Sequence, residues 1–204
     1  MRTIRIQAAA LALTSAGAAA LVACGPSQTT GTAPAQPNST TAEQALGTIA
    51  RLAAERVMTA DTVAAAKWGT TQPIDDPARE KTVLDDAAAQ AAKLGIDQAT
   101  VQQIFKDQIA ANKDVQRALY AQWREHPAEQ PTHRPDLATQ VRPILDRVDS
   151  QLLTAIQKAQ PLLPRPDCAA LLERGKATTV QAMGLDAVHR SGLDQALAHT
   201  CPTR

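Results

Sequence analysis

Apolar positions recur at helical spacing through most of this chain of 204 residues. Residues three, four and seven apart fall on one face of a helix, so such a stripe predicts an amphipathic helix with one buried side. The first helix is expected over residues 41–68, where Asp61 could cap a break. Its stripe consists of Ala45, Leu46, Ile49, Leu52, Ala53, Val57 and Val63.

Capping residues mark the second and third helices. Asp76 offers an N-cap side chain and Pro77 suits the first helical position, so a helix is expected from there to the residue before Gly95. Asp97 then opens a third helix over 98–125, which has the most regular apolar pattern of the chain.

The remaining helices are shorter or less regular. A proline-containing linker over 126–135 precedes a helix over 136–160, and Pro143 makes that helix irregular near its start. Two short helices are expected over 166–183 and 185–199. No segment shows the sustained alternation of β-branched residues that is typical of strands. The sequence therefore predicts an all-α helical bundle.

The first 23 residues have the layout of a secretory signal. Arg2 and Arg5 precede an uncharged stretch over 6–23 that consists mostly of alanine and leucine. Small and polar residues interrupt this stretch, which argues against a transmembrane anchor. We therefore expect export to a periplasmic or other extracytoplasmic location.

Residues 21–24, which end in Cys24, resemble a bacterial lipoprotein box, where the cysteine becomes the lipidated first residue. The alternative is ordinary cleavage before Cys24, which leaves a free thiol. Residues 25–39 are mostly Gly, Pro, Ser, Thr, Gln and Ala and show no apolar period, as expected of a tether, and this favours a lipid anchor. The expected organisation is a signal over 1–23, the cysteine and tether over 24–42, and a folded domain over 43–204.

Composition limits the classes of function. The net charge is +1, and only two Trp, one Tyr and one Phe are present. There is no basic patch with interleaved aromatics, no glycine-rich phosphate loop and no His/Cys cluster at metal spacing, so we expect neither nucleic acid nor a metal or cofactor. In an oxidising compartment Cys168 and Cys201 should form a disulfide, which would stabilise the fold by about 3 to 4 kcal/mol.

Several polar residues have spacings that could direct them to one interior point. Arg56 and Lys67 lie eleven residues apart, close to three whole turns, and share a face of one helix. Each such residue taken singly is most simply a solvated surface group, and only the combination points to a site. The others are Asp76, Arg79 and Glu80 in one first turn, and Asn112 with Gln116 four residues apart.

In this order and spacing, these residues resemble the chorismate mutases of the all-helical AroQ class. The local sequences of residues 54–56, 63–68, 73–76 and 105–109 are similar to those of the exported subclass. The resemblance covers about residues 43–201. It implies a homodimer whose complete pocket lies within one chain, whereas shorter cytoplasmic relatives borrow an arginine from a partner subunit.

The resemblance also assigns two features of the second half of the chain. After a one-residue shift following Leu137, Arg142 matches the position that supplies the extra arginine internally. Cys168 and Cys201 match a disulfide characteristic of exported members.

The implied reaction, chorismate to prephenate, is a concerted [3,3] rearrangement that needs no nucleophile, general base or cofactor. Guanidinium groups suit the two carboxylates of chorismate, and donors suit its ether oxygen, where negative charge develops. The resemblance therefore implies that Arg56, Arg79 and Arg142 bind the carboxylates. Lys67 and Gln116 would donate hydrogen bonds to the ether oxygen. Glu80, with the backbone near Asp76, would bind the ring hydroxyl. Asn112 would donate to a carboxylate, and Val63, Val83 and Ile109 would supply apolar walls.

Two positions depart from the pattern of the family. Asn112 stands where relatives usually carry Ser or Thr, and Gln116 stands where some exported members carry Glu. A glutamate must be protonated before it can donate, whereas glutamine donates at any pH, so activity here should not require acidic conditions.

Two alternatives stay open. One is a catalytically inactive helical envelope lipoprotein that acts as a binding module, because fold does not fix function. The other is a helical carrier of metal or haem, although the spacing of its candidate ligands is wrong for a compact site. Those ligands would be His126, His133, His189 and His199.

Overall fold

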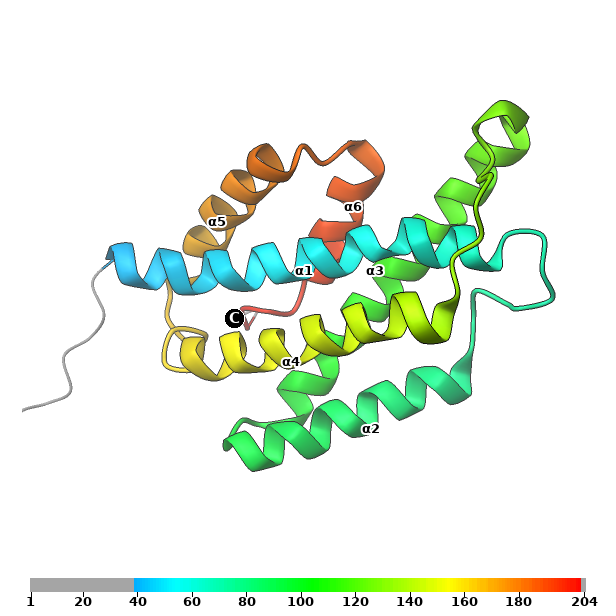
Figure 1. Ribbon diagram of the computed structural model, residues 1–204. Helices are drawn as coiled ribbons and strands as arrows, with labels where there is room; N and C mark the ends of the chain where they lie inside the picture. The colour runs from blue at the N-terminus through cyan, green and yellow to red at the C-terminus, as the bar shows by residue number, and fades with distance from the viewer. Residues whose placement is uncertain (1–38, 203–204) are drawn as a thin grey trace, which may run out of the picture. The chain divides into compact units, whose positions relative to one another are not determined.

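The computed structural model describes residues 39–202, which form helices and connecting loops without a β-strand (Figure 1). The predicted all-α class is confirmed for this part of the chain. The expected signal, Cys24 and the tether up to residue 38 lie outside the described residues. The helices are α1 Ser39–Lys67, α2 Pro77–Leu94, α3 Gln98–Glu125, α4 Arg142–Ala159, α5 Cys168–Met183 and α6 Ala187–Ala196, with short turns η1 Pro127–Glu129 and η2 Leu137–Val141.

The starts of α2 and α3 follow the predicted capping signals. The Asp76 carboxylate accepts a hydrogen bond from the backbone amide of Arg79 at 3.0 Å, and Asp97 accepts one from Thr100 at 2.8 Å. These bonds satisfy backbone donors that the first turn of a helix leaves unpaired. Gly95 ends α2 with φ of 69°, a left-handed conformation that glycine adopts without strain.

Some details of the helices differ from the sequence expectation. The capping role expected for Asp61 is wrong, because α1 runs without a break from Ser39 to Lys67. The Asp61 carboxylate instead bonds the ring of His189 at 2.9 Å, so it does not compete for the backbone of α1. Helices α5 and α6 are also shorter than predicted: α5 begins at Cys168 instead of residue 166, and α6, which Asp186 caps, covers Ala187–Ala196 instead of residues 185–199.

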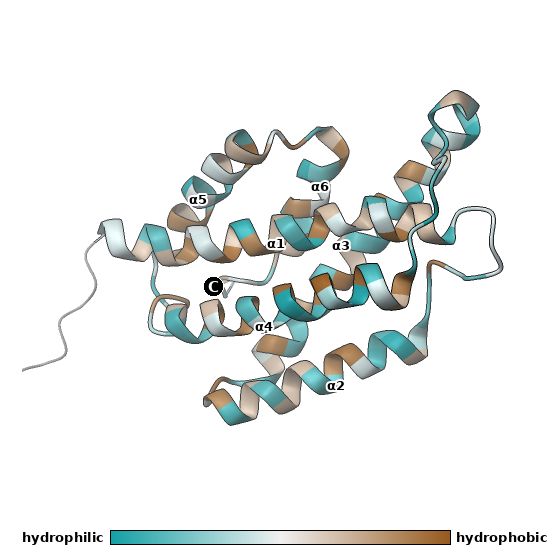
Figure 2. Ribbon diagram, viewed as in Figure 1, coloured by the Kyte–Doolittle hydropathy of each residue, from teal (hydrophilic) through white to brown (hydrophobic). Residues whose placement is uncertain are grey.

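The core lies around α1, which packs against α3, α4, α5 and α6, while α2 packs on α3 and α4 (Figure 1). Hydrophobic positions alternate with hydrophilic ones along the helices, as expected of amphipathic helices that share an interior (Figure 2). Since aromatic residues are few, aliphatic side chains fill this core. The largest fully buried side chains include Leu46, Ile49, Leu52, Ile104, Phe105, Leu152, Leu153, Ile156, Leu171 and Leu193.

Helices α1 and α5 approach closely at a pair of glycines. A Cβ atom added to Gly175 would lie 2.6 Å from the Cα atom of Gly47. This distance leaves no room for a side chain, so the close packing of these two helices depends on Gly175.

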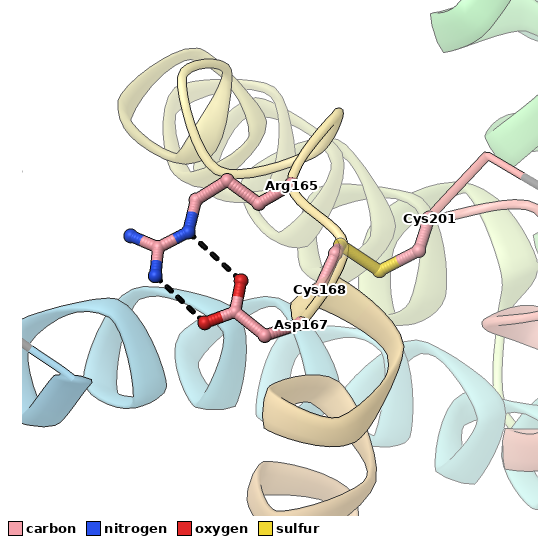
Figure 3. The surroundings of a disulfide bond; sticks show 4 residues. All are labelled: Arg165, Asp167, Cys168 and Cys201. Carbon is pink, nitrogen blue, oxygen red and sulfur yellow. Dashed lines mark hydrogen bonds and ion pairs between the residues drawn. A yellow bond between two sulfur atoms is a disulfide. The ribbon is translucent and has the colours of Figure 1, made fainter.

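The connections that hold the C-terminal part in place include a disulfide and a buried histidine. The predicted disulfide between Cys168 and Cys201 is present, with Cα atoms 5.9 Å apart, and it joins the start of α5 to the segment after α6 (Figure 3). Beside it, the Arg165 guanidinium donates two hydrogen bonds to Asp167, at 2.8 and 2.7 Å. The last segment is therefore covalently held to the bundle.

The second connection is His189 of α6, which lies between two carboxylates. Its Nε2 atom is 2.9 Å from Asp61 of α1, and its Nδ1 atom is 2.8 Å from Asp186. The bond to Asp61, together with that to Asp186, outweighs burial and raises the pKa of His189 to about 9. The imidazole is therefore a cation at neutral pH and ties α6 to α1.

Candidate active site

A cavity of about 650 Å³ opens among α1, α2, α3, α4 and the loops that precede α2 and α4. Val63, Val83 and Ile109 supply apolar parts of its wall, as predicted. The structure also brings together all eight residues that the sequence suggested as substrate contacts. They are Arg56, Lys67, Asp76, Arg79, Glu80, Asn112, Gln116 and Arg142.

Arg56 is held deep in this cavity by a carboxylate of α4. The arginine is 5% exposed, and its Nε atom donates to Asp149 at 2.6 Å. Its guanidinium carbon also lies 6.0 Å from the centre of the Phe105 ring. A guanidinium carries five N–H donors in a rigid fork, so the bond to Asp149 fixes its orientation and leaves the terminal nitrogens for an anionic ligand.

Lys67, the last residue of α1, contributes a partly desolvated cation. Its Nζ atom donates to the backbone oxygen of Pro73 at 2.8 Å and lies 3.5 Å from that of Ile74. Burial lowers the pKa of this lysine, while the nearby carboxylates of Asp76, Asp75 and Glu80 act in the opposite direction. An ammonium group with reduced hydration interacts more strongly with an anionic ligand than one in bulk water.

Glu80 lies in an ion-pair network that links α2 to α3. Lys113 of α3 donates to both carboxylate oxygens of Glu80, at 2.9 and 3.1 Å, and its Nζ atom is 3.0 Å from Asp75. Burial acts to lower the pKa of Lys113, but its bonds to Glu80 and Asp75 outweigh this effect and raise it. The backbone amide of Asp76 also donates to Glu80 at 3.3 Å. The carboxylate is thus fixed from two directions.

Asn112 and Gln116 form a buried chain of amides between α3 and α1. The Asn112 amide nitrogen donates to the backbone oxygen of Arg56 at 3.0 Å and to the Thr59 hydroxyl at 3.2 Å. Its oxygen accepts a bond from the Gln116 amide nitrogen at 2.8 Å. Both hydrogens of the Asn112 amide are therefore engaged within the protein, whereas Gln116 keeps one amide hydrogen for a ligand.

Arg142 reaches the cavity after one turn of π-helix. The carboxylate of Asp136 caps this turn by accepting from the Thr139 amide at 2.7 Å, and the Arg142 amide then bonds the oxygen of Leu137, five residues earlier. An α-helix uses a spacing of four, so the turn takes up one extra residue. Pro143 lacks the amide hydrogen that a regular helix would use there, and the predicted irregular start is confirmed.

Exposed arginines gather at the solvent side of the cavity. Arg79 comes from the first turn of α2, Arg142 from the start of α4, and Arg134 from the loop between α3 and α4. The Arg134 guanidinium lies against Gly69, where it is 3.4 Å from the position that a Cβ atom would take. These three cations come from separate segments, and the exposed carboxylates of Asp76, Asp136 and Asp146 line the same cavity, so a ligand at the entrance meets both signs of charge.

Comparison with known proteins assigns the family. The profile of the family described as chorismate mutase type II matches residues 47–117. The secreted chorismate mutase of Mycolicibacterium smegmatis is 35% identical over 149 residues, which cover 73% of this chain and 82% of that protein. The chain belongs to the chorismate mutase family. This confirms the resemblance seen in the sequence.

Further relatives of this chorismate mutase chain agree. The secreted chorismate mutase of Mycobacterium tuberculosis is 33% identical over 156 residues, which cover 76% of this chain and 78% of that protein. A crystal structure of chorismate mutase from Burkholderia phymatum has a TM-score of 0.75 and 37% identity, and it covers 79% of this chain and 99% of that chain. The shared fold therefore extends over nearly all of the described residues.

Charged cavity residues of this chorismate mutase that were missed in the sequence include Lys113, Asp149 and Arg134. Lys113 lies four residues after Ile109, and Asp149 lies seven after Arg142, so helical spacing could have placed both on the faces that line the site. Arg134 lies in a linker, where no periodic pattern indicates the direction of a side chain.

Proposed function

We propose that this chain is an extracytoplasmic chorismate mutase, an isomerase that rearranges chorismate to prephenate. The observation that carries the proposal is that five side chains line one cavity of a single chain: Arg56, Arg79, Arg142, Lys67 and Gln116. The volume of about 650 Å³ suits a small molecule. Relatives named secreted chorismate mutase support both the activity and a location outside the cytoplasm.

The arginines are proposed to hold the two carboxylates of chorismate. Arg56 offers its terminal nitrogens from the buried side, while Arg79 and Arg142 approach from the exposed side. A planar guanidinium binds two carboxylate oxygens at once, which fixes direction as well as position. Opposite placement of the cations favours the compact, chair-like substrate conformation that the concerted rearrangement requires.

Lys67 and Gln116 are proposed to stabilise the ether oxygen. Negative charge builds on this atom as its bond to carbon stretches, and donors already in place lower the barrier without reorganisation. Lys67 would exchange its bond to the Pro73 oxygen for the ether oxygen, and Gln116 would use its second amide hydrogen. The buried Gln116 oxygen has no hydrogen-bond partner among the described residues, so the bond from its amide nitrogen to Asn112 is what orients the amide.

Glu80 and Asn112 complete the proposed site. Glu80 would accept a hydrogen bond from the ring hydroxyl of chorismate, close to the backbone of Asp76. Asn112 has both amide hydrogens engaged within the protein, so we assign it the positioning of Gln116 and of the Arg56 segment in place of the expected contact with a carboxylate. No metal or cofactor takes part in this scheme.

Three further features belong to the proposal and come from the sequence. We propose cleavage of the signal over 1–23, lipid attachment at Cys24 through a tether that leads to the catalytic domain, and assembly as a homodimer. The mass of the mature N-terminus would reveal an attached lipid, and light scattering would give the oligomeric state.

The activity is tested by mixing purified protein with chorismate and following the loss of its ultraviolet absorbance. Lys67→Ala should lower kcat by about a hundredfold or more, because losing one donor at developing charge costs about 3 to 4 kcal/mol. Lys106→Ala, which removes an exposed lysine of α3, is the matched control. An active Lys67→Ala variant would disprove the role of Lys67, and failure of the wild type to consume chorismate would favour the inactive lipoprotein.

A further inference from the structure

Lys113 lines the cavity, although the proposed chemistry gives it no contact with the substrate. Its side chain is 20% exposed, and it makes two bonds to Glu80 and an ion pair with Asp75. Exposed ion pairs contribute little, but this lysine is mostly buried and bonds both oxygens of one carboxylate. We therefore expect Lys113 to have a role within the site.

The negative charge of Glu80 indicates what Lys113 does in the site. A cavity that binds a dianion contains a carboxylate whose negative charge repels the ligand. Lys113 is the cation that bonds Glu80 directly among the described residues, since Lys67 bonds backbone oxygens and Arg56 bonds Asp149. Without Lys113, Glu80 would have no directly bonded cation among the described residues, and its negative charge would lie next to the substrate.

Lys113 also connects three parts of the site wall. Through Glu80 and Asp75 it joins α3 to the first turn of α2 and to the loop before it. Arg117, one turn further along α3, reinforces this contact with bonds to Asp75 at 2.7 and 2.9 Å. In the proposed mechanism Lys67 gives up its bond to the Pro73 oxygen to reach the substrate, and the bonds from α3 would then keep that loop in place.

We propose that Lys113 is a positioning residue that neutralises and orients Glu80, so that an acidic acceptor can operate in a cavity for a dicarboxylate. This inference rests on the proposed function. Lys113 acts only through Glu80, and this distinguishes it from the substrate-binding arginines. The two residues should therefore depend on each other in any measure of substrate binding.

A double-mutant cycle with chorismate tests this dependence. Lys113→Met should raise KM about tenfold, because the unpaired Glu80 then repels the substrate. Lys113→Arg should restore KM to within a few-fold of the wild type. In Glu80→Gln, the charge that Lys113 compensates is gone, so the Lys113→Met and Glu80→Gln double variant should have a lower KM than Lys113→Met alone.

The control is Lys81→Met, which removes an exposed lysine of α2 that pairs with Asp85 outside the cavity. Unfolding temperatures of all variants identify any loss of folding, and Lys113→Gln replaces Lys113→Met if the latter does not fold. Changes in KM that simply multiply, or a Lys113 variant with wild-type KM, would overturn the inference while leaving the activity intact. A wild type that does not consume chorismate would instead reject the proposed function, and this inference with it.

Discussion

Raising the pH should weaken the attachment of α6 to α1, because His189 is bound as a cation between Asp61 and Asp186. The histidine side chain is 9% exposed, and its pKa is raised from 6.5 to about 9. A raised folded-state pKa means that protonation favours the folded state. The stabilisation is therefore complete below about pH 6.5 and is lost as the pH rises through about 9.

The size of this effect follows from the shift and from the exposure of the partners. A pKa raised from 6.5 to about 9 corresponds to about 3 kcal/mol of stabilisation in the protonated state. Asp61 and Asp186 are 52% and 65% exposed, so water screens part of the interaction. We therefore expect the wild type to lose about 2 kcal/mol from this histidine.

Urea unfolding of the wild type and of His189→Gln, at about pH 6 and about pH 10, measures this loss directly. Other groups titrate equally in the two proteins, so the difference between them reports His189 alone. The free energy of unfolding of the wild type should fall by about 2 kcal/mol more than that of the variant. Parallel losses in the two proteins would refute the reasoning.

Three other perturbations have definite expected outcomes. Gly175→Ala forces a Cβ atom to 2.6 Å from Gly47, so it should cost about 1 to 3 kcal/mol and lower the Tm, and an unchanged Tm would contradict the close contact of α1 and α5. Replacing Cys168 and Cys201 with serine should lower the free energy of urea unfolding by about 3 to 4 kcal/mol. Gln116→Glu should make kcat fall from mildly acidic to neutral pH, while the wild-type kcat stays constant; equal pH profiles would argue against Gln116 as a donor.

Local signals in the sequence located the helices well. Asp97 and the apolar period after it act within a few residues, and the structure has α3 at Gln98–Glu125, as predicted. The Asp76 cap and Gly95 likewise fixed both ends of α2. The candidate site was also recognisable, because helical spacing places Arg56 and Lys67 on one face whatever packs against them.

Contacts between distant residues could not be derived in this way. Asp61 could satisfy a helix end or a distant side chain, and only the packing of α6 on α1 brings His189, 128 residues later, to it. The bond from Lys113 to Glu80 likewise spans 33 residues and depends on how α2 lies on α3. A single sequence specifies which groups can bond, but the packing of helices decides which of them meet.

The π turn over Leu137–Val141 has a consequence for finding related enzymes in genomes. Under the proposed assignment of Arg142, an alignment without the one-residue shift after Leu137 would place another residue at the position of the family's internal arginine. The chain would then be classified as lacking that residue and as dependent on a partner subunit. Surveys of this family should therefore allow a single-residue insertion at the start of α4 before they count a site as incomplete.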